Sequence, residues 1–169
     1  TMQFGVVPGV SGQLPGDGTS QAFDANASGQ NVYFNVTAQP GDSYLLTLAN
    51  VRATGSSGSS YSVIVNSPSG SQYTSATCYT SSPAGNCDIR LWYLPPGKYS
   101  VAVLPVNGGT LHFNASLTKA MTGPDLTSGQ TANLSFGTGQ WARLTFQANG
   151  GDTVALQAAG STGSYAQPV

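Results

Sequence analysis

Apolar and polar residues alternate along much of this chain, beginning with the segment at residues 29–48. Its apolar positions are Val32, Phe34, Val36, Tyr44, Leu46 and Leu48. They fall on either side of a Gln-Pro-Gly-Asp turn at 39–42. A period of two residues is the pattern of a half-buried strand, and Pro and Gly favour a tight turn. We therefore predict a β-hairpin here, with the apolar side chains facing the core.

Further short runs with the same period continue through the first two thirds of the chain. They lie at 61–65, 71–77, 89–94, 99–103 and 111–115. Pro- and Gly-containing turns separate several of them, and no run has a convincing helical period. Short strands at this spacing are typical of sandwiches. The predicted fold is all-β, an antiparallel β-sandwich of jelly-roll-like type.

The pattern of the first hairpin occurs a second time. Residues 139–158, "GQWARLTFQANGGDTVALQA", match residues 29–48, "GQNVYFNVTAQPGDSYLLTL", with a shift of 110 residues. The turn Gly and Asp and the inward apolar positions are kept. Likewise "TMQF" at 1–4 matches "TLHF" at 110–113. Such self-similarity is the signature of a repeat protein.

We divide the chain accordingly into three parts. Residues 8–120 are expected to form one complete sandwich repeat. Residues 1–7 correspond to the closing strand of a preceding repeat, and residues 121–169 to the opening strands of a following one. The chain is then either a window from an array or a subunit with complementary ends.

Neither end segment can bury its apolar face alone. The side chains concerned include Met2 and Phe4 at one end and Leu144 and Phe146 at the other. We expect strand pairing to cover them, and the partners would be neighbouring repeats or identical subunits in a head-to-tail assembly.

Charge is scarce, which limits the kinds of partner. Only 7% of the residues are charged and the formal net charge is −1. This balance argues against nucleic-acid binding and against a polybasic membrane-surface protein. No apolar run reaches the roughly 18 residues of a membrane span, so we expect no membrane insertion.

The two cysteines, Cys78 and Cys87, are nine residues apart and flank Pro83 and Gly85. A chain reversal between them favours a disulfide, and hence an oxidising compartment and a secreted protein. A pair of buried free thiols is the alternative. A metal site needs more ligands than these two, and the single histidine, His112, is distant in sequence.

No catalytic signature is present. His112 lies between two apolar residues on a predicted strand, without a serine-hydrolase motif, and is interpreted as a solvent-facing strand residue. Asp42 and Asp152 occupy equivalent turns, where an aspartate bonds its own backbone. We expect no catalytic residues, no metal and no cofactor.

Aromatic residues offer the more open possibility of a binding surface. In "IRLWYLPP" the alternation that buries Leu91 turns Arg90 and Trp92 to the other face, and Tyr79 lies in the cysteine loop. These side chains could stack on glycans. Trp92 could equally contact a neighbouring domain or be packed under a loop.

The segment "LPPGKYSVAVLP" resembles the L-P-x-G-x-Y-x-V-x-V signature of bacterial pre-peptidase C-terminal-like (PPC-like) β-sandwich domains. The longer pattern is similar to tandem modules of large secreted bacterial proteins of the Rhs/YD-repeat and adhesin type. The resemblance implies a non-enzymatic structural or adhesive module of an extracellular or cell-surface protein. The alternatives are a filament subunit assembled by β-strand complementation and a carbohydrate-binding accessory module.

Overall fold

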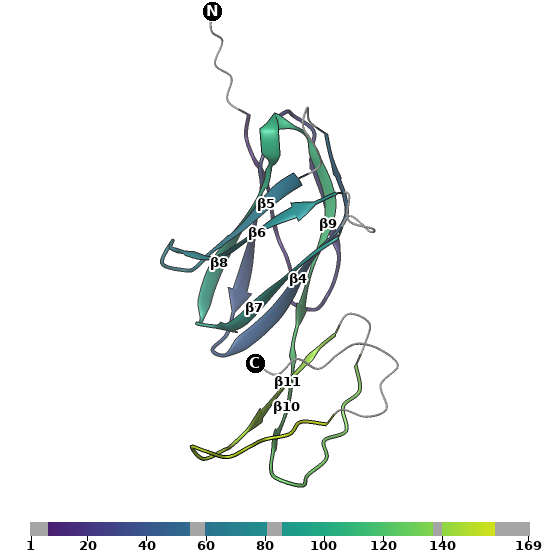
Figure 1. Ribbon diagram of the computed structural model, residues 1–169. Coiled ribbons are helices and arrows are strands. Elements are labelled where there is room, and N and C mark those ends of the chain that lie inside the picture. The colour runs from purple at the N-terminus through teal and green to yellow at the C-terminus, as the bar shows by residue number, and fades with distance from the viewer. Residues whose placement is uncertain (1–6, 55–59, 81–85, 137–139, 158–169) are drawn as a thin grey trace, which may run out of the picture.

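The computed structural model describes residues 7–54, 60–80, 86–136 and 140–157. Within them the chain forms a β-sandwich of two sheets, followed by a smaller two-stranded sheet below it (Figure 1). No α-helix occurs in this part of the chain, and its single helical turn is the 3-10 segment η1 (Val106–Gly108). The predicted all-β sandwich is confirmed.

The first sheet of the sandwich has five strands. In spatial order they are β1 (Val10–Gln13), β3 (Val32–Ala38), β8 (Gly97–Pro105), β5 (Ser60–Asn66) and β6 (Gln72–Tyr79). All its neighbours run antiparallel except β1 and β3, which pair parallel from Val10 opposite Val32. The sheet is therefore antiparallel except at this edge.

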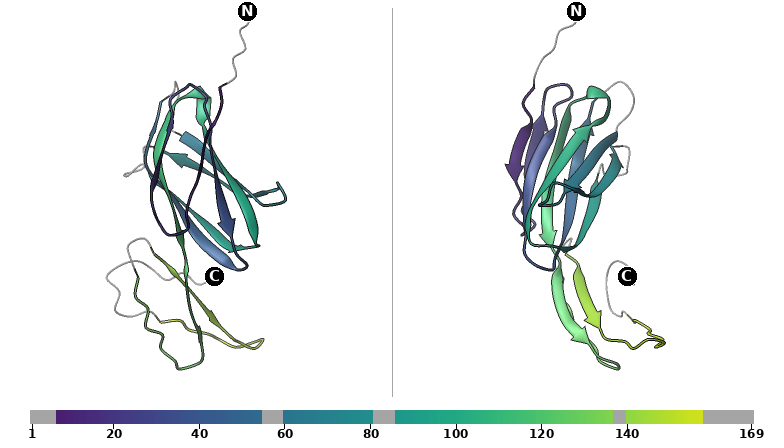
Figure 2. Two further views of the ribbon diagram at one scale, coloured as in Figure 1. Left: turned by 180° about the vertical axis from the view of Figure 1, so that it is seen from behind. Right: turned by 90° about the vertical axis from the view of Figure 1, so that its left-hand side faces the viewer.

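The second sheet has four strands, all antiparallel. In spatial order they are β2 (Gln21–Ala25), β9 (Leu111–Lys119), β4 (Asp42–Ala53) and β7 (Cys87–Leu94). Figure 2 shows β9 continuing beyond the lower end of the sandwich into the two-stranded sheet. That small sheet consists of β10 (Met121–Leu126) and β11 (Ala142–Phe146).

The segment predicted as a hairpin is instead an arch between the two sheets. Its first strand, β3, pairs with β8, whereas its second strand, β4, pairs with β7 and β9. The turn itself forms as expected, since Asp42 N–H donates to the Gln39 carbonyl at 3.1 Å. The prediction of a hairpin was wrong because alternation shows which side of a strand is buried but not which strand lies beside it.

The core lies between the sheets and contains the residues of 32–115 that were predicted to face inward, together with others that were not, such as Phe23 and Val51. Phe23 of β2 contacts Phe34 across the sheets at 5.3 Å between ring centroids, and it stacks on Phe113 of β9 at 5.4 Å. Burying one such side chain stabilises the fold by roughly 1.5–3 kcal/mol. This packing determines the side chains of the inner faces, so a binding site is expected on the outer faces of the sheets.

The small C-terminal sheet has the pairing geometry of the first edge of the sandwich. Met121 pairs parallel with Ala142 in β10 and β11, as Val10 pairs with Val32 in β1 and β3. Its following turn also matches: Asp152 N–H donates to the Asn149 carbonyl at 3.1 Å. Gly151 takes the left-handed conformation of this turn (φ 95°), as its counterpart does in the first turn.

Cys78 and Cys87 are bridged, with their Cα atoms 5.9 Å apart, as their spacing predicted. The disulfide joins β6 of one sheet to β7 of the other. Such bonds persist in oxidising environments, which indicates a location outside the cytoplasm. Met2 and Phe4, the N-terminal candidates for strand complementation, lie outside the described residues.

Candidate functional site

Two β-bulges, one in β4 and one in β7, change which side chains face outward from the sandwich. Among the described residues, the non-glycine residues with positive φ are Asn50 (φ 55°) and Tyr93 (φ 46°). Each lies where a strand carries one more residue than its partner, in β4 and β7 respectively. Bulges redirect side chains, and left-handed backbone costs free energy outside glycine. Candidate sites are therefore expected among the side chains around Asn50 and Tyr93.

The bulge in β7 brings two aromatic side chains to one face. Regular alternation would send Tyr93 inward after Trp92, but the extra residue leaves both rings on the outer side of the sheet. Trp92 contacts Trp141 edge to face, with 4.7 Å between ring centroids, and the Arg143 guanidinium lies 4.0 Å from the Tyr93 ring. We call this contact between the sandwich and the small sheet the junction.

The junction contains hardly any linker. Ala120 alone separates β9 from β10, and its N–H donates to the Ser43 carbonyl at 2.8 Å. Next to it, Met121 N–H donates to the Trp141 carbonyl at 2.9 Å. The Ser43 hydroxyl in turn accepts a hydrogen bond from Tyr93 N–H at 3.0 Å. Backbone and aromatic contacts thus both restrain the small sheet against the sandwich.

An ion pair lies beside the junction. Lys119 Nζ is 2.7 Å from Asp42 Oδ1, and the Asp42 carboxylate is buried. Its Oδ2 accepts hydrogen bonds from Gln39 N–H at 2.9 Å and from the Tyr44 hydroxyl at 2.8 Å. Burial alone would raise the pKa of Asp42, but these hydrogen bonds and the charge of Lys119 outweigh it and lower that pKa. The predicted turn role of Asp42 is confirmed, while the lysine partner was not foreseen.

The aromatic candidates from the sequence are not gathered at one place. Arg90 lies with Trp92, its guanidinium 6.0 Å from the Trp92 ring centroid. Tyr79 is 59% exposed but follows Cys78 at the disulfide end of β6 and β7. The hydroxyl near Trp92 belongs to Tyr73, which donates to the Trp92 carbonyl at 2.6 Å. Trp92 is thus a partly buried junction residue.

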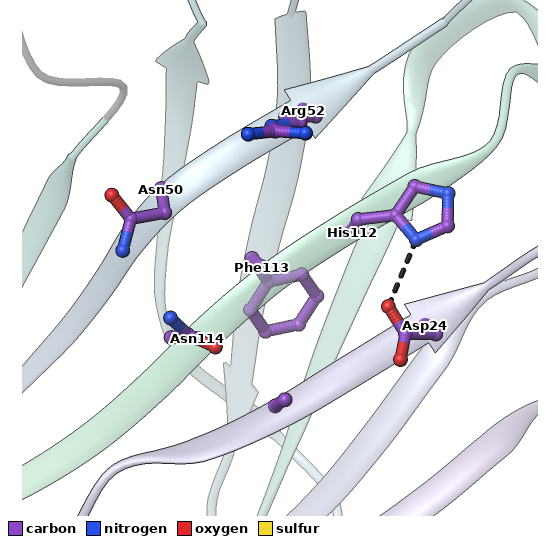
Figure 3. Close-up of a pocket in the computed structure, with 7 residues that line it drawn as sticks. Asp24, Asn50, Arg52, His112, Phe113 and Asn114 are labelled. Atoms are coloured by element: carbon purple, nitrogen blue, oxygen red, sulfur yellow. Dashed lines mark hydrogen bonds and ion pairs between the residues drawn. The ribbon is translucent and has the colours of Figure 1, made fainter.

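A second candidate lies on the outer face of the four-stranded sheet, at the other bulge. It is an open depression of about 490 Å³ lined by Ala22, Asp24, Asn50, Arg52, His112, Phe113 and Asn114 (Figure 3). His112 Nδ1 lies 2.9 Å from Asp24 Oδ1. His112 is a strand residue on the outer face, as predicted. Sequence reasoning considered it alone and missed the neighbours that the sheet register supplies.

The described part of the chain has neither a cluster of metal-binding side chains nor a membrane-spanning helix. No group of three or more His, Cys, Asp or Glu side chains there could hold a metal ion. Nor does any described helix have the length and apolar character needed to cross a membrane.

No family model matches this sequence, and no curated protein sequence matches it either. Among solved structures, the pre-peptidase C-terminal domain of a Bacillus anthracis collagenase is 14% identical, with a TM-score of 0.42 over 68% of this chain and 100% of that one. The periplasmic inhibitor of g-type lysozyme PliG from Aeromonas hydrophila is 13% identical, with a TM-score of 0.39 over 67% and 99% of the two chains.

A third structure, TmCBM61 in complex with β-1,4-galactotriose, is 15% identical, with a TM-score of 0.38 over 58% of this chain and 67% of that one. Each likeness is to a β-sandwich-like fold and extends to no function.

Proposed function

We propose that this chain is a non-enzymatic structural or adhesive module of a larger extracellular tandem-repeat protein. The supporting observation is the repeated parallel pairing, Val10 opposite Val32 and Met121 opposite Ala142. In this interpretation residues 8–120 are one complete module. Residues 121–157 then contribute the opening strands of the next module, in which β11 occupies the position that β3 has in the first.

The junction supports a structural role. A single residue between β9 and β10 leaves little freedom of rotation, and the Trp92 and Trp141 rings pack against each other. Domains that move independently are normally joined by flexible linkers with few crossing contacts. Modules joined in this way would form a stiff rod, suited to holding a distal activity away from a surface.

The apolar surface of the small sheet also supports a following module. Phe136, Phe146, Val154 and Leu156 are each more than half exposed. Such side chains are worth roughly 1.5–3 kcal/mol each when buried. In the sandwich β3 lies between β1 and β8, and β10 already takes the place of β1 beside β11. The proposal therefore assigns a β8-like strand to the free edge of β11.

A chimera tests this proposal directly. Leu156 occupies the position of Leu46, so the test protein follows Leu156 with a second copy of residues 47–119. We expect the appended strands to complete a second sandwich. Amide hydrogens of β11 should then exchange much more slowly than in the present chain, as measured by hydrogen–deuterium exchange.

The matched control carries Val101→Asp and Val103→Asp in the appended copy only. Both valines are fully buried in β8, so two buried carboxylates prevent that strand from packing. The control should leave β11 as fast in exchange as before. If the unmodified chimera also leaves β11 unprotected, the repeat interpretation is wrong.

Head-to-tail assembly is the second candidate, favoured by the same exposed apolar side chains. Here residues 1–7 of one molecule would complete the open sheet of the next, which gives a filament. Sedimentation of the full chain and of a chain starting at Pro8 distinguishes the two. Strand donation requires that the full chain associates and that the chain starting at Pro8 does not. Equal association of the two chains contradicts it.

A further inference from the structure

Three ionisable side chains lie together on the outer face of the four-stranded sheet in this sparsely charged protein. The chain has five basic and six acidic residues and a single histidine. Asp24, His112 and Arg52 nevertheless form a row across three adjacent strands, because the register places His112 opposite Asp24 on one side and opposite Arg52 on the other. Together they line one side of the depression in Figure 3.

The bulge in β4 creates this row. Leu46 and Leu48 face the core, so regular alternation would direct position 52 inward as well. Between Ala49 and Arg52 the strand has one residue more than β9, and Asn50 takes the left-handed conformation. Val51 then enters the core and Arg52 faces solvent. Asn50 thus has an unfavourable backbone conformation, and the bulge at this residue places Arg52 beside His112.

Small side chains leave room between these polar groups. Ala22 lies opposite Asn114, in the row next to the charged one. Its methyl group leaves open the space that a longer side chain on β2 would fill. The resulting volume of about 490 Å³ lies within the roughly 300–1,000 Å³ of small-ligand sites.

The hydrogen-bonding groups of the depression are largely unused. Within the described residues, no hydrogen bond or ion pair engages the guanidinium of Arg52 or the side-chain amides of Asn50 and Asn114. Asp24 uses Oδ1 for His112 and keeps Oδ2 as an acceptor. The site therefore offers a planar cationic fork, two amides that donate and accept, and one carboxylate oxygen.

We propose that this depression binds a carboxylate-bearing saccharide, such as a uronic acid unit of an acidic glycan. Arg52 would hold the sugar carboxylate in a bidentate pair, the geometry that a guanidinium favours. The amides of Asn50 and Asn114 and the free oxygen of Asp24 would bind hydroxyl groups, which both donate and accept. Asp24 disfavours multiply charged anions such as phosphate esters, since a second negative charge would lie against its carboxylate.

The test uses D-glucuronate and its uncharged analogue D-glucuronamide as probes of the full chain. Titrations followed by ¹⁵N NMR should move the side-chain signals of Arg52, Asn50 and Asn114 with glucuronate. Glucuronamide should bind at least about tenfold more weakly, because the charge-assisted pair is lost. Arg52 is exposed, so Arg52→Gln should leave the fold intact and weaken glucuronate binding by about tenfold or more.

Arg90→Gln is the matched control, since Arg90 is an exposed arginine on the neighbouring strand of the same sheet but outside the depression. It should change the affinity less than about twofold. The proposal is overturned if glucuronate at about 100 mM moves no signal of the depression. Equal binding of glucuronamide, or an equal effect of the two arginine substitutions, overturns it as well.

Discussion

Replacing Asp42 by alanine should weaken the fold at the point where the sandwich meets the small sheet. The carboxylate lies in the arch between β3 and β4 and is only 7% exposed. It holds Lys119 at the end of β9, Tyr44 in β4 and the backbone of Gln39. Asp42→Ala removes all three contacts at once and leaves the Tyr44 hydroxyl and the Gln39 N–H without their principal acceptor.

The size of the loss follows from the partners. Hydrogen bonds to a charged group contribute about 1.5–3 kcal/mol each, which applies to the bonds from Tyr44 and Gln39. Lys119 is half exposed, so its ion pair contributes only roughly 0.5–1 kcal/mol after solvent screening. Tyr44 keeps a long contact to the Thr37 carbonyl at 3.4 Å. That retained contact and the coupling between neighbouring bonds keep the total near the lower end of the sum, so we expect the free energy of unfolding to fall by about 3–5 kcal/mol.

Urea denaturation of matched variants measures this loss. Asp152 occupies the equivalent turn of the C-terminal segment, where its exposed carboxylate accepts one backbone hydrogen bond from Asn149 at 2.7 Å. Because solvent screens a bond to an exposed carboxylate, Asp152→Ala should cost less than about 1 kcal/mol, below the range for the buried bonds of Asp42. Equal losses for the two variants would refute the role assigned to the buried contacts of Asp42.

The same contacts predict an acid dependence. The pKa of Asp42 is lowered in the folded protein, so its contribution is complete above the unfolded value of about 3.9. It disappears as the pH falls through the lower folded value. Unfolding of Asp42→Ala should thus be less sensitive to acid than that of the parent chain. Parallel acid profiles of the two proteins would contradict the assignment.

Three further outcomes are expected. Trp141→Ala should shift the fluorescence of Trp92 to the red and raise its quenching by acrylamide, because the ring that packs on it is removed; unchanged quenching would show that the junction is open in solution. Replacing Cys78 and Cys87 together by alanine should cost about 2.5 kcal/mol in urea denaturation, as expected for so small a closed loop. Tyr61→Phe should leave stability unchanged or slightly higher, since the buried hydroxyl has no partner within the described residues; a loss above about 1 kcal/mol would reveal a missing partner.

The sequence allowed prediction of strand positions and buried faces but not of strand neighbours. Phe34 and Leu46 both lie inward as their alternation indicates. Yet their strands belong to different sheets, because a turn of this length serves an arch as well as a hairpin. The parallel pairing of Val10 with Val32 was missed for the same reason: pairing is a long-range property, and β1 has only four residues.

The candidate sites were harder to predict because both depend on bulges. Asn50 tolerates left-handed backbone, so its conformation has a weak local signal, but Tyr93 has none. One extra residue in a strand reverses the direction of every side chain after it. Trp92 was recognised from its position opposite Leu91, whereas the partner Trp141 and the row beside His112 follow only from the fold.

Backbone features recur along this chain, whereas the side chains of the junction do not. The turn aspartate, the turn glycine and the parallel pairing of two opening strands occur in both segments. The side chains of the junction do not: with the shift of 110 residues, Trp141 corresponds to Asn31 and Arg143 to Tyr33.

The same division explains why the recurring turn and pairing residues give little information on ligands. Turn and pairing residues satisfy backbone requirements that any module of this fold must meet. Outer-face side chains are free of those requirements, since the core packs without them, so they can differ from one module to the next. In a tandem protein built in this way, binding would vary between modules while the rod that carries them stays the same. If the proposed tandem arrangement holds, the positions to compare between modules are those of Arg52 and His112, which carry charge in this chain, rather than the recurring turns.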